Sequence, residues 1–542
     1  MIRPFNTSFV FGFMALLLLF WMALIACDTL PTQESLIEPT HESASDASTE
    51  AAPTEHSSDH TSEALPTETT PDPFPPEGAP ETTQDSPTEP NESSNEIAPE
   101  NIAEIIPETT PTEETANEMP DQPTGPQRIQ WASLQWPPVV TTYAQQTSRP
   151  IYGQFYAQGY TDQQKGQPLP RAYVEIGYGP LDSDPRNQPS AWRWSAQTTF
   201  HKSTGLHDNN HEYKATLTIP QAGHYRYTFR FRLEDGPWLY GDRADYGRLG
   251  SQDGFSPKDI GVIAVVQPSA RFRMASFNLH CLVEQPEKRL QAIADAIAAE
   301  QIDFLSLQEV CRPQGSATPD SAARLATLLQ QKGLSYTSFF TQTHVGQHDG
   351  ASFDEGIGFL SRHPVLETQA LPIPPNKTPP AGAFPRKAAW GRIATPVGIL
   401  SLLSTHLAFR ADQGWWRAEE AAALKSAMTD GAFLANAWIV GGDFNASPSD
   451  PAYATMTQAN QPPQTPAWTD LLKGSDEGPT FPASAPSIRI DYLFLHRPPP
   501  SSDSPVSLLT RQAKRFLTAP LQGGLYLSDH VGVLVELEAA AP

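Results

Sequence analysis

Polar side chains suited to phosphate-ester chemistry recur in the C-terminal half of this 542-residue chain, and most of them follow an apolar run. A polar group at the end of a buried strand is fixed by the sheet and exposed by the loop that follows, as a rigid active site requires. Seven segments have this character: 276–280 (SFNLH), 307–309 (LQE), 355–362 (EGIGFLSR), 404–407 (STHL), 441–445 (GGDFN), 489–492 (RIDY) and 528–530 (SDH). They predict one site assembled at strand ends.

Hydrolysis of a phosphate ester requires that phosphate oxygens be neutralised, a water activated and the departing alkoxide stabilised. Carboxylate-rich sites that hold Mg²⁺ meet the first and third requirements, with Mn²⁺ or Ca²⁺ as alternatives. We expect Glu309 to be the main metal ligand, with Asn278 and Asp529 nearby, because the strands ending at Asn278 and Glu309 should be neighbours. The imidazoles of His406 and His530 suit proton transfer and charge stabilisation beside the phosphate.

In their order and spacing, these segments resemble the endonuclease/exonuclease/phosphatase superfamily, which has the fold of deoxyribonuclease I, over roughly residues 270–538. The resemblance implies an α+β catalytic domain that is a four-layer α/β/β/α sandwich. It also implies that Asp443 orients or deprotonates the attacking water and that Asn445 helps to hold this water and the phosphate. His530, oriented by Asp491, and His406 would flank the phosphate.

One segment departs from the sequence GNAILSR of the secreted nucleases, because Ile357 stands at the Asn position. With Glu355 before it, this version is more similar to phosphodiesterases and to lipid- or RNA-directed branches than to deoxyribonuclease I. Arg386 lies in the segment 384–390, where such branches often carry a basic substrate contact. A solvated strand end would explain Arg386 equally well.

The amino terminus predicts a cell-envelope location. Arg3 precedes a long apolar stretch that ends in Leu-Ile-Ala before Cys27, which is typical of a secretory signal. The run resembles a bacterial lipobox, so residues 1–27 would be the signal peptide and lipidation site, with Cys27 carrying the lipid. An uncleaved membrane anchor is the alternative. Either arrangement tethers the chain to the inner or outer membrane, with its catalytic domain outside the cytoplasm.

Residues 28–126 contain 24 Asp and Glu residues and no Lys or Arg, in a sequence rich in Pro, Thr and Ser. Such a stretch cannot bury enough apolar surface to offset its ordering entropy, so we expect a disordered, extended linker. It accounts for nearly all of the formal net charge of −25. Residues 271–542 carry 21 basic and 25 acidic residues and lack the Lys/Arg stripe typical of tight nucleic-acid binding.

Residues 127–268 predict an all-β domain. The segments 173–178, 213–219 and 225–232 alternate with the period of two expected of half-buried antiparallel strands, and an immunoglobulin-like sandwich fits them best. Its tryptophans are either packing residues or a possible glycan contact; they are Trp131, Trp136, Trp192, Trp194 and Trp238.

Residues 269–542 predict the catalytic domain. Apolar residues recur at helical spacing in 287–300, 321–332 and 415–428, between the apolar strands. With Cys27 assigned to lipid, Cys281 and Cys311 remain, and two thiols in an oxidising compartment tend to pair. We expect this disulfide beside the active site; two unrelated buried thiols are the alternative.

Three functions are compatible with the sequence. The leading hypothesis is a membrane-tethered, monomeric, Mg²⁺-dependent phosphodiesterase, most simply a nonspecific nuclease acting on extracellular nucleic acid. The second is a phospholipase C-like enzyme or phosphomonoesterase acting on membrane or inositol phosphate headgroups. The third is a non-catalytic surface adhesion protein, which the presence of every expected site residue argues against.

Overall fold

A computed structural model describes residues 125–348, 350–428, 433–459, 467–497 and 506–541. The expectations for the signal segment, for Cys27 and for most of the acidic linker lie outside these residues. No helix in the described part of the chain is long and apolar enough to cross a membrane. The domain boundaries assigned above stay a prediction.

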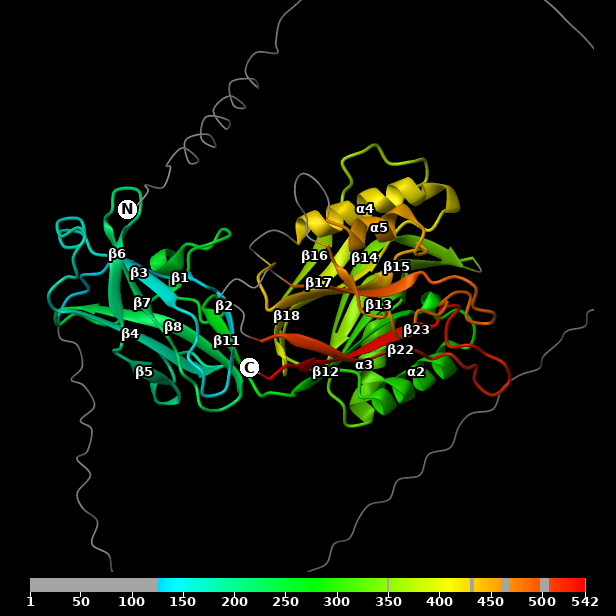
Figure 1. Cartoon of the computed structure of the whole chain (residues 1–542), viewed down its shortest axis with the longest axis horizontal. Helices are drawn as coiled ribbons and strands as arrows, with labels where there is room; N and C mark the ends of the chain where they lie inside the picture. Colours follow the sequence, from blue (N-terminus) through cyan, green and yellow to red (C-terminus); the bar gives the residue numbers. More distant parts are fainter. Residues whose placement is uncertain (1–124, 349, 429–432, 460–466, 498–505, 542) are drawn as a thin grey trace, which may run out of the picture. The chain divides into compact units, whose positions relative to one another are not determined.

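The first described part of the chain is all-β, with two sheets that share one core (Figure 1). The first sheet has the order β10 (Asp242–Arg243), β1 (Trp131–Trp136), β3 (Ile151–Tyr156), β7 (Asn210–Ala215) and β6 (Thr199–Thr204). The second has the order β2 (Val139–Tyr143), β11 (Gly261–Val266), β8 (Gly223–Leu233), β4 (Ala172–Pro180) and β5 (Arg193–Ser195), and β9 (Leu239–Tyr240) pairs with β8. Phe155 of the first sheet packs against Phe231 of the second.

The sequence predicted that the tryptophans of this domain serve either in packing or in glycan contact. Three of them, Trp192, Trp194 and Trp238, form stacking contacts with one another or with Arg230. Trp192 stacks on Trp194 with ring centroids 5.5 Å apart. The guanidinium of Arg230 lies 4.2 Å from the ring centroid of Trp194 and 4.3 Å from that of Trp238. These ring faces therefore already have protein partners.

The part of the chain from Arg271 onward contains two further six-stranded sheets. The third sheet has the order β14 (Thr337–His348), β15 (Ala351–Ser361), β13 (Phe304–Pro313), β12 (Arg271–Asn278), β23 (Gly532–Ala539) and β22 (Leu508–Phe516). The fourth has the order β16 (Val365–Pro372), β17 (Lys387–Thr395), β18 (Gly398–His406), β19 (Ala437–Asp443), β21 (Asp491–His496) and β20 (Thr469–Asp470).

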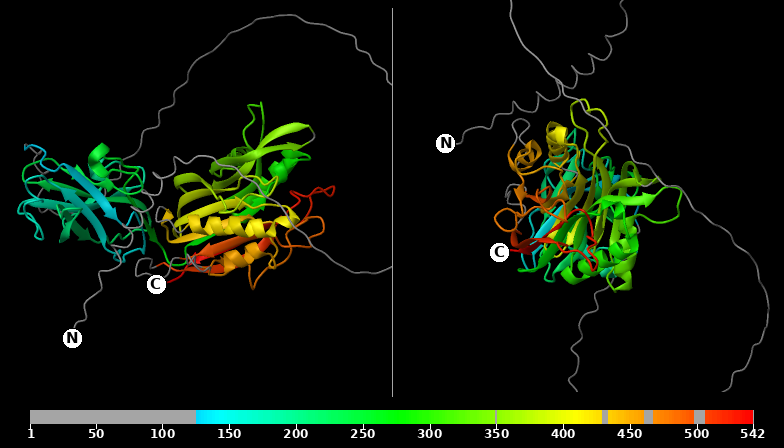
Figure 2. Two further views of the ribbon diagram at one scale, coloured as in Figure 1. Left: turned by 90° about the horizontal axis from the view of Figure 1, so that it is seen from above. Right: turned by 90° about the vertical axis from the view of Figure 1, so that its right-hand side faces the viewer.

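Helices cover the outer faces of these two sheets, so the expected α+β sandwich is confirmed (Figures 1 and 2). One core joins α2 (Pro286–Glu300) and α3 (Ser321–Gln331) to the third sheet. Another joins α4 (Gly414–Ala427) and α5 (Pro451–Thr457) to the fourth sheet. A third apolar cluster fills the space between the sheets and includes Phe359 and Leu402. The three helices expected from apolar spacing correspond to α2, α3 and α4.

Small and polar residues let the two sheets approach closely near the strand ends. A Cβ atom on Gly441 of β19 would lie 2.7 Å from the hydroxyl oxygen of Ser306 on β13. The hydroxyl of Ser306 donates to the Leu403 carbonyl over 3.0 Å, and that of Ser404 donates to the Leu307 carbonyl over 2.8 Å. Hydrogen bonds therefore fix one sheet against the other where an apolar core alone would permit sliding.

Glu309 differs from the expectation of a strand-end carboxylate, because β13 continues to Pro313. The register between β13 and β15 shifts between Leu307 and Val310, and Glu309 has a φ of +47°. This irregularity is a bulge, which re-aims a side chain without ending the strand. The apolar run before Glu309 predicted a strand there, but it did not predict that the strand continues beyond Glu309.

The buried side chain of Arg289 hydrogen-bonds to two loops of the third sheet, the one that follows Asn278 and the one that precedes Asp529. The Arg289 guanidinium donates to the Leu527 carbonyl over 2.8 Å from Nε, to the Val283 carbonyl over 2.6 Å and to the Leu279 carbonyl over 2.9 Å. Leu279 follows Asn278, and Leu527 lies two residues before Asp529. Cys281 and Cys311 form the expected disulfide, with their Cα atoms 5.0 Å apart.

Replacing Arg289 with Met should lower the free energy of unfolding by about 2–5 kcal/mol, because buried carbonyls would lose their donors. Chemical denaturation measures this change. Lys288→Met, at the exposed neighbouring position, is the matched control and should change stability by less than about 0.5 kcal/mol. Equal stability of the two variants would contradict a structural role for Arg289.

Candidate active site

Strand register places the predicted catalytic residues side by side. In the fourth sheet, His406 is the direct neighbour of Asp443 across β18 and β19, and Asp443 is that of Asp491 across β19 and β21. In the third sheet, Asn278 of β12 pairs with Gln308 of β13. The two sheets thus present their functional groups at a shared edge.

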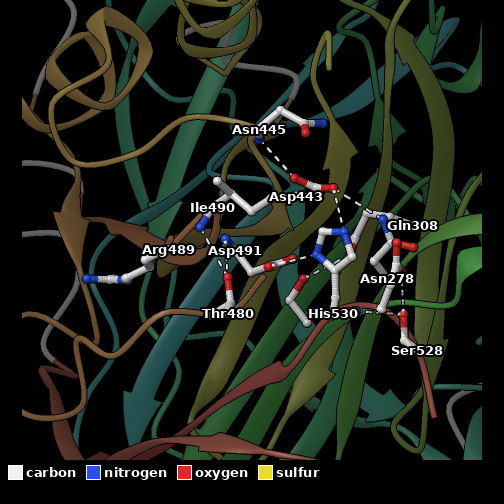
Figure 3. Close-up of polar contacts among 12 residues, drawn as sticks. Asn278, Gln308, Asp443, Asn445, Thr480, Arg489, Ile490, Asp491, Ser528 and His530 are labelled. Carbon is white, nitrogen blue, oxygen red and sulfur yellow. Dashed lines mark hydrogen bonds and ion pairs between the residues drawn. The ribbon is translucent and has the colours of Figure 1, made fainter. Parts of the chain in front are cut away.

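The carboxylate of Asp443 lies at the centre of the site and is 1% exposed (Figure 3). Its Oδ2 atom lies 3.2 Å from Nδ2 of Asn278, 3.5 Å from Nε2 of His406 and 3.6 Å from Nε2 of His530. The Asn445 backbone amide donates to its Oδ1 atom over 2.8 Å. Burial raises the pKa of Asp443, and the nearby His530 opposes this shift.

Asp491 holds His530 through a 2.9 Å contact between Oδ2 and Nδ1, as Figure 3 shows. The Thr480 hydroxyl oxygen in turn accepts from the backbone amides of Ile490 and Asp491 over 3.1 and 3.2 Å. Burial alone would lower the pKa of His530, but the carboxylates of Asp491 and Asp443 outweigh it and raise this pKa. His530 is therefore held in its protonated form.

His406 has the opposite tendency. Burial lowers its pKa well below the ordinary value, and the positive charges of Arg386 and His530 add to this effect. The two imidazoles that contact Asp443 therefore favour different protonation states. Environments that separate titrating groups in this way are a mark of acid and base roles.

The predicted metal-ligand residues lie on the third-sheet side. Nδ2 of Asn278 donates to Oε1 of Glu309 over 2.9 Å, while its Oδ1 accepts from the backbone amide of His280 over 2.8 Å. Asn278 thus orients the Glu309 carboxylate and offers it an amide nitrogen, which is not a metal ligand in this orientation. Oδ1 of Asp529 lies 3.5 Å from Nδ1 of His280. The ligand role of Asn278 stays a prediction.

A cavity of about 780 Å³ opens onto these groups. The predicted residues that line it are Glu309, Arg386, His406, Asp443, Asn445, Asp529 and His530. Asn278 and Asp491 do not line it and instead support the residues that do. Arg386 is 6% exposed, and its Nε atom has no hydrogen-bond partner.

Two lining residues received no role from the sequence: His344, which was not considered, and Glu355, which was named only as part of its segment. They are direct neighbours across β14 and β15. Their Nε2 and Oε2 atoms lie 3.5 Å apart. Burial, reinforced by Arg386, lowers the pKa of His344 to about 4. Burial and the negative charge of Glu309 raise the pKa of Glu355 to about 7. Alternation places both residues on one face of their strands, but it does not show which face meets the site.

Sequence reasoning also missed the side chains of α4 that hold the loop after His406. Oε2 of Glu420 accepts from the Ala408 backbone amide over 2.8 Å. The Arg417 guanidinium donates to the carbonyls of Ala408 and Arg410 over 3.2 and 2.7 Å. The helical spacing of three residues between Arg417 and Glu420 was the available signal.

The donor set fits a hard divalent cation. Ligating atoms of Glu309, His406 and Asp443 lie within 4.8 Å of one another. Acidic side chains contribute most of these donors, which is the preference of Mg²⁺, Mn²⁺ and Ca²⁺.

The sandwich and this cluster define a hydrolase that acts on phosphoric esters. Residues 275–530 match the model of the Endonuclease/Exonuclease/phosphatase family. Its enzymes depend on divalent metals and act on phosphodiester substrates such as nucleic acids. No curated protein sequence matches the chain.

Solved structures of related fold have low sequence identity. A family protein from Leptotrichia buccalis C-1013-b is 19% identical, over 49% of this chain and 99% of its own, with a TM-score of 0.39. One from Beutenbergia cavernae DSM 12333 is 23% identical over 50% and 72%, with a TM-score of 0.38. A third, from Bacteroides vulgatus, is 19% identical over 50% and 99%, with a TM-score of 0.37.

Glu420 should make stability depend on pH. Burial raises its pKa from 4.5 to about 7, although the Ala408 amide and Arg386 oppose the shift. Between these two values the unfolded chain releases a proton that the folded chain retains. The free energy of unfolding therefore falls by about 1.4 kcal/mol per pH unit as pH rises through this window.

Glu420→Gln removes this titration and should reduce the loss of stability between pH 5 and pH 8. Denaturant titrations at both pH values measure the difference. Glu419→Gln, on the adjacent position, is the control and should keep the wild-type dependence. An unchanged dependence in Glu420→Gln would show that Glu420 is already ionised at pH 5.

Proposed function

We propose that this chain is a membrane-tethered, extracytoplasmic, Mg²⁺-dependent phosphodiesterase whose leading substrate is extracellular nucleic acid, cleaved without sequence specificity. The observation that carries the proposal is the buried carboxylate of Asp443 between two histidines of opposite protonation tendency. That arrangement suits in-line attack of water on a phosphate ester, because it provides an acceptor and a positive donor within one cavity.

In this proposal each residue has a distinct task. Asp443 orients the attacking water and accepts its proton. The protonated His530, held by Asp491, donates to a phosphate oxygen and stabilises the charge that develops there. The neutral His406 lies on the other side of Asp443 and lines the same cavity.

Two further side chains complete the phosphate environment. Asn445 fixes Asp443 through its backbone amide, while its Nδ2 donates to the Leu407 carbonyl over 3.2 Å. Arg386 is a buried guanidinium in the same cavity, and its planar donors match a phosphate oxygen pair. Arg386 is therefore proposed as the substrate contact.

Mg²⁺ is the proposed cofactor, with Mn²⁺ or Ca²⁺ as substitutes. Glu309 and Asp529 would hold it, and Asn278 would fix the Glu309 carboxylate. When bound, the ion supplies neutralisation of phosphate charge and stabilisation of the leaving oxygen.

Phospholipase C-like or phosphomonoesterase activity on membrane or inositol phosphate headgroups is the second candidate. It is favoured by Ile357 in place of the Asn of secreted nucleases and by the proposed location beside a membrane. Three further expectations stay predictions: glycan contact through the all-β part of the chain, a monomeric state and a non-catalytic adhesive role. The activity assay described next also tests the adhesive role.

Glu309→Gln, Asp443→Asn and His530→Ala should each lower phosphodiester hydrolysis by at least about 10²-fold, because each removes a charge-stabilising or proton-transfer group. Chelation with EDTA should abolish it. The assay uses the full chain with Mg²⁺, Mn²⁺ or Ca²⁺ on DNA, RNA, bis-p-nitrophenyl phosphate, sphingomyelin and phosphoinositides.

Glu287→Gln is the matched control, because the Glu287 side chain is 81% exposed and lies outside the cavity. It should keep wild-type activity. Failure of the wild-type chain to hydrolyse any of these diesters, together with binding of glycans, would favour the adhesion hypothesis.

Cys27→Ser should release the protein from membranes or block its maturation, because the proposed lipid would have no attachment atom. Membrane fractionation and mass spectrometry of the mature amino terminus measure this. Wild-type protein found soluble, with an unmodified Cys27, would disprove the lipid anchor.

A further inference from the structure

Two aromatic rings form a nearly parallel stack at the catalytic cavity. The ring centroids of His344 and Phe384 lie 4.2 Å apart with an interplanar angle of 22°, and both side chains line the cavity. Phe384 is nevertheless 38% exposed. Its ring therefore packs on His344 and still presents apolar surface to a bound molecule.

A second exposed aromatic ring comes from the neighbouring loop. Phe409 is 56% exposed and lines the same cavity. Gly382, two residues before Phe384, has a φ of +73°, and a Cβ atom there would lie 2.9 Å from Nη2 of Arg410. The segment that carries Phe384 therefore packs directly against the one that carries Phe409.

This aromatic surface adjoins the proposed phosphate position. Arg386 follows Phe384 by two residues, is 6% exposed and has an Nε atom without a hydrogen-bond partner. It lines the cavity together with Asp443 and His530. A molecule whose phosphate contacts Arg386 would place its adjacent group against the rings.

We propose that His344 and Phe384 form a stacking platform for an unpaired nucleobase next to the scissile phosphodiester, so that the enzyme prefers single-stranded nucleic acid to duplex. The inference rests on the proposed nuclease function and names its substrate class. Bases in a duplex are already stacked and paired, and an unpaired base offers its free face to an aromatic ring.

Two observations favour a base over an acyl chain as the occupant. The stack with His344 fixes the orientation of the Phe384 ring, and the exposed part of that planar ring matches a planar base better than a flexible chain. The catalytic part of the chain also carries more acidic than basic residues. Stacking supplies affinity that does not depend on a basic groove, whereas phosphate contacts alone require one.

The test compares kcat/KM of the full chain on single-stranded oligothymidylate, on the same length of strand with abasic residues, and on duplex DNA. Phe384→Ala should lower kcat/KM on oligothymidylate by about 5- to 100-fold. The ratio between base-containing and abasic strands should fall toward one. Phe384→Trp should keep or increase the wild-type ratio, because it retains an aromatic face.

Leu509→Ala is the control, since Leu509 is 40% exposed and lies on β22 outside the cavity. It should keep the wild-type ratio. If Phe384→Ala also keeps this ratio while the chain still cleaves DNA, the platform is disproved and the nuclease function stands. If Phe384→Ala loses only activity on sphingomyelin vesicles, the rings face lipid and the inference is wrong. If the wild-type chain cleaves no nucleic acid, both proposals fail.

Discussion

The carboxylate of Asp443 imposes the main constraint on this fold. A charge that is 1% exposed is tolerated only where hydrogen-bond donors surround it. One of these donors, Asn278, ends a strand of the third sheet. The imidazole of His406, whose Nε2 lies 3.5 Å from Oδ2 of Asp443, ends a strand of the fourth. His530 lies two residues before β23 of the third sheet. Both sheets must therefore hold their spacing for one carboxylate to remain stable.

The contacts between the sheets meet this requirement. Gly441 removes the side chain that would collide with Ser306, and the Ser306 and Ser404 hydroxyls donate across to the opposite sheet. Gly441 lies two residues before Asp443, and Ser404 lies two residues before His406. Rigidity is thus concentrated where the site needs it.

Sequence alone predicted the parts of the site that follow a buried apolar run. Asn278, His406 and Asp443 each end such a strand, and their chemistry is recognisable from residue type. His344 was not predicted, and Glu355 was named without a role, because both lie within strands, where alternation does not say which face meets the cavity. The role of Glu420 was not predicted, because it accepts a hydrogen bond from the backbone amide of Ala408, and this contact depends on the tertiary structure. The bulge at Glu309 was also not predictable from the sequence. Glu309 has a left-handed φ, and glutamate seldom adopts this conformation.

The Cys281–Cys311 disulfide encloses the whole of α2 within a closed loop, because α2 spans Pro286–Glu300. Its sequence separation of 30 residues corresponds to about 3–4 kcal/mol of lost chain entropy in the unfolded ensemble. Before oxidation, the helix that carries Arg289 and the turn after Asn278 lack this constraint. The catalytic half therefore gains its full stability only after this disulfide has formed, so its folding free energy depends on the redox conditions around it.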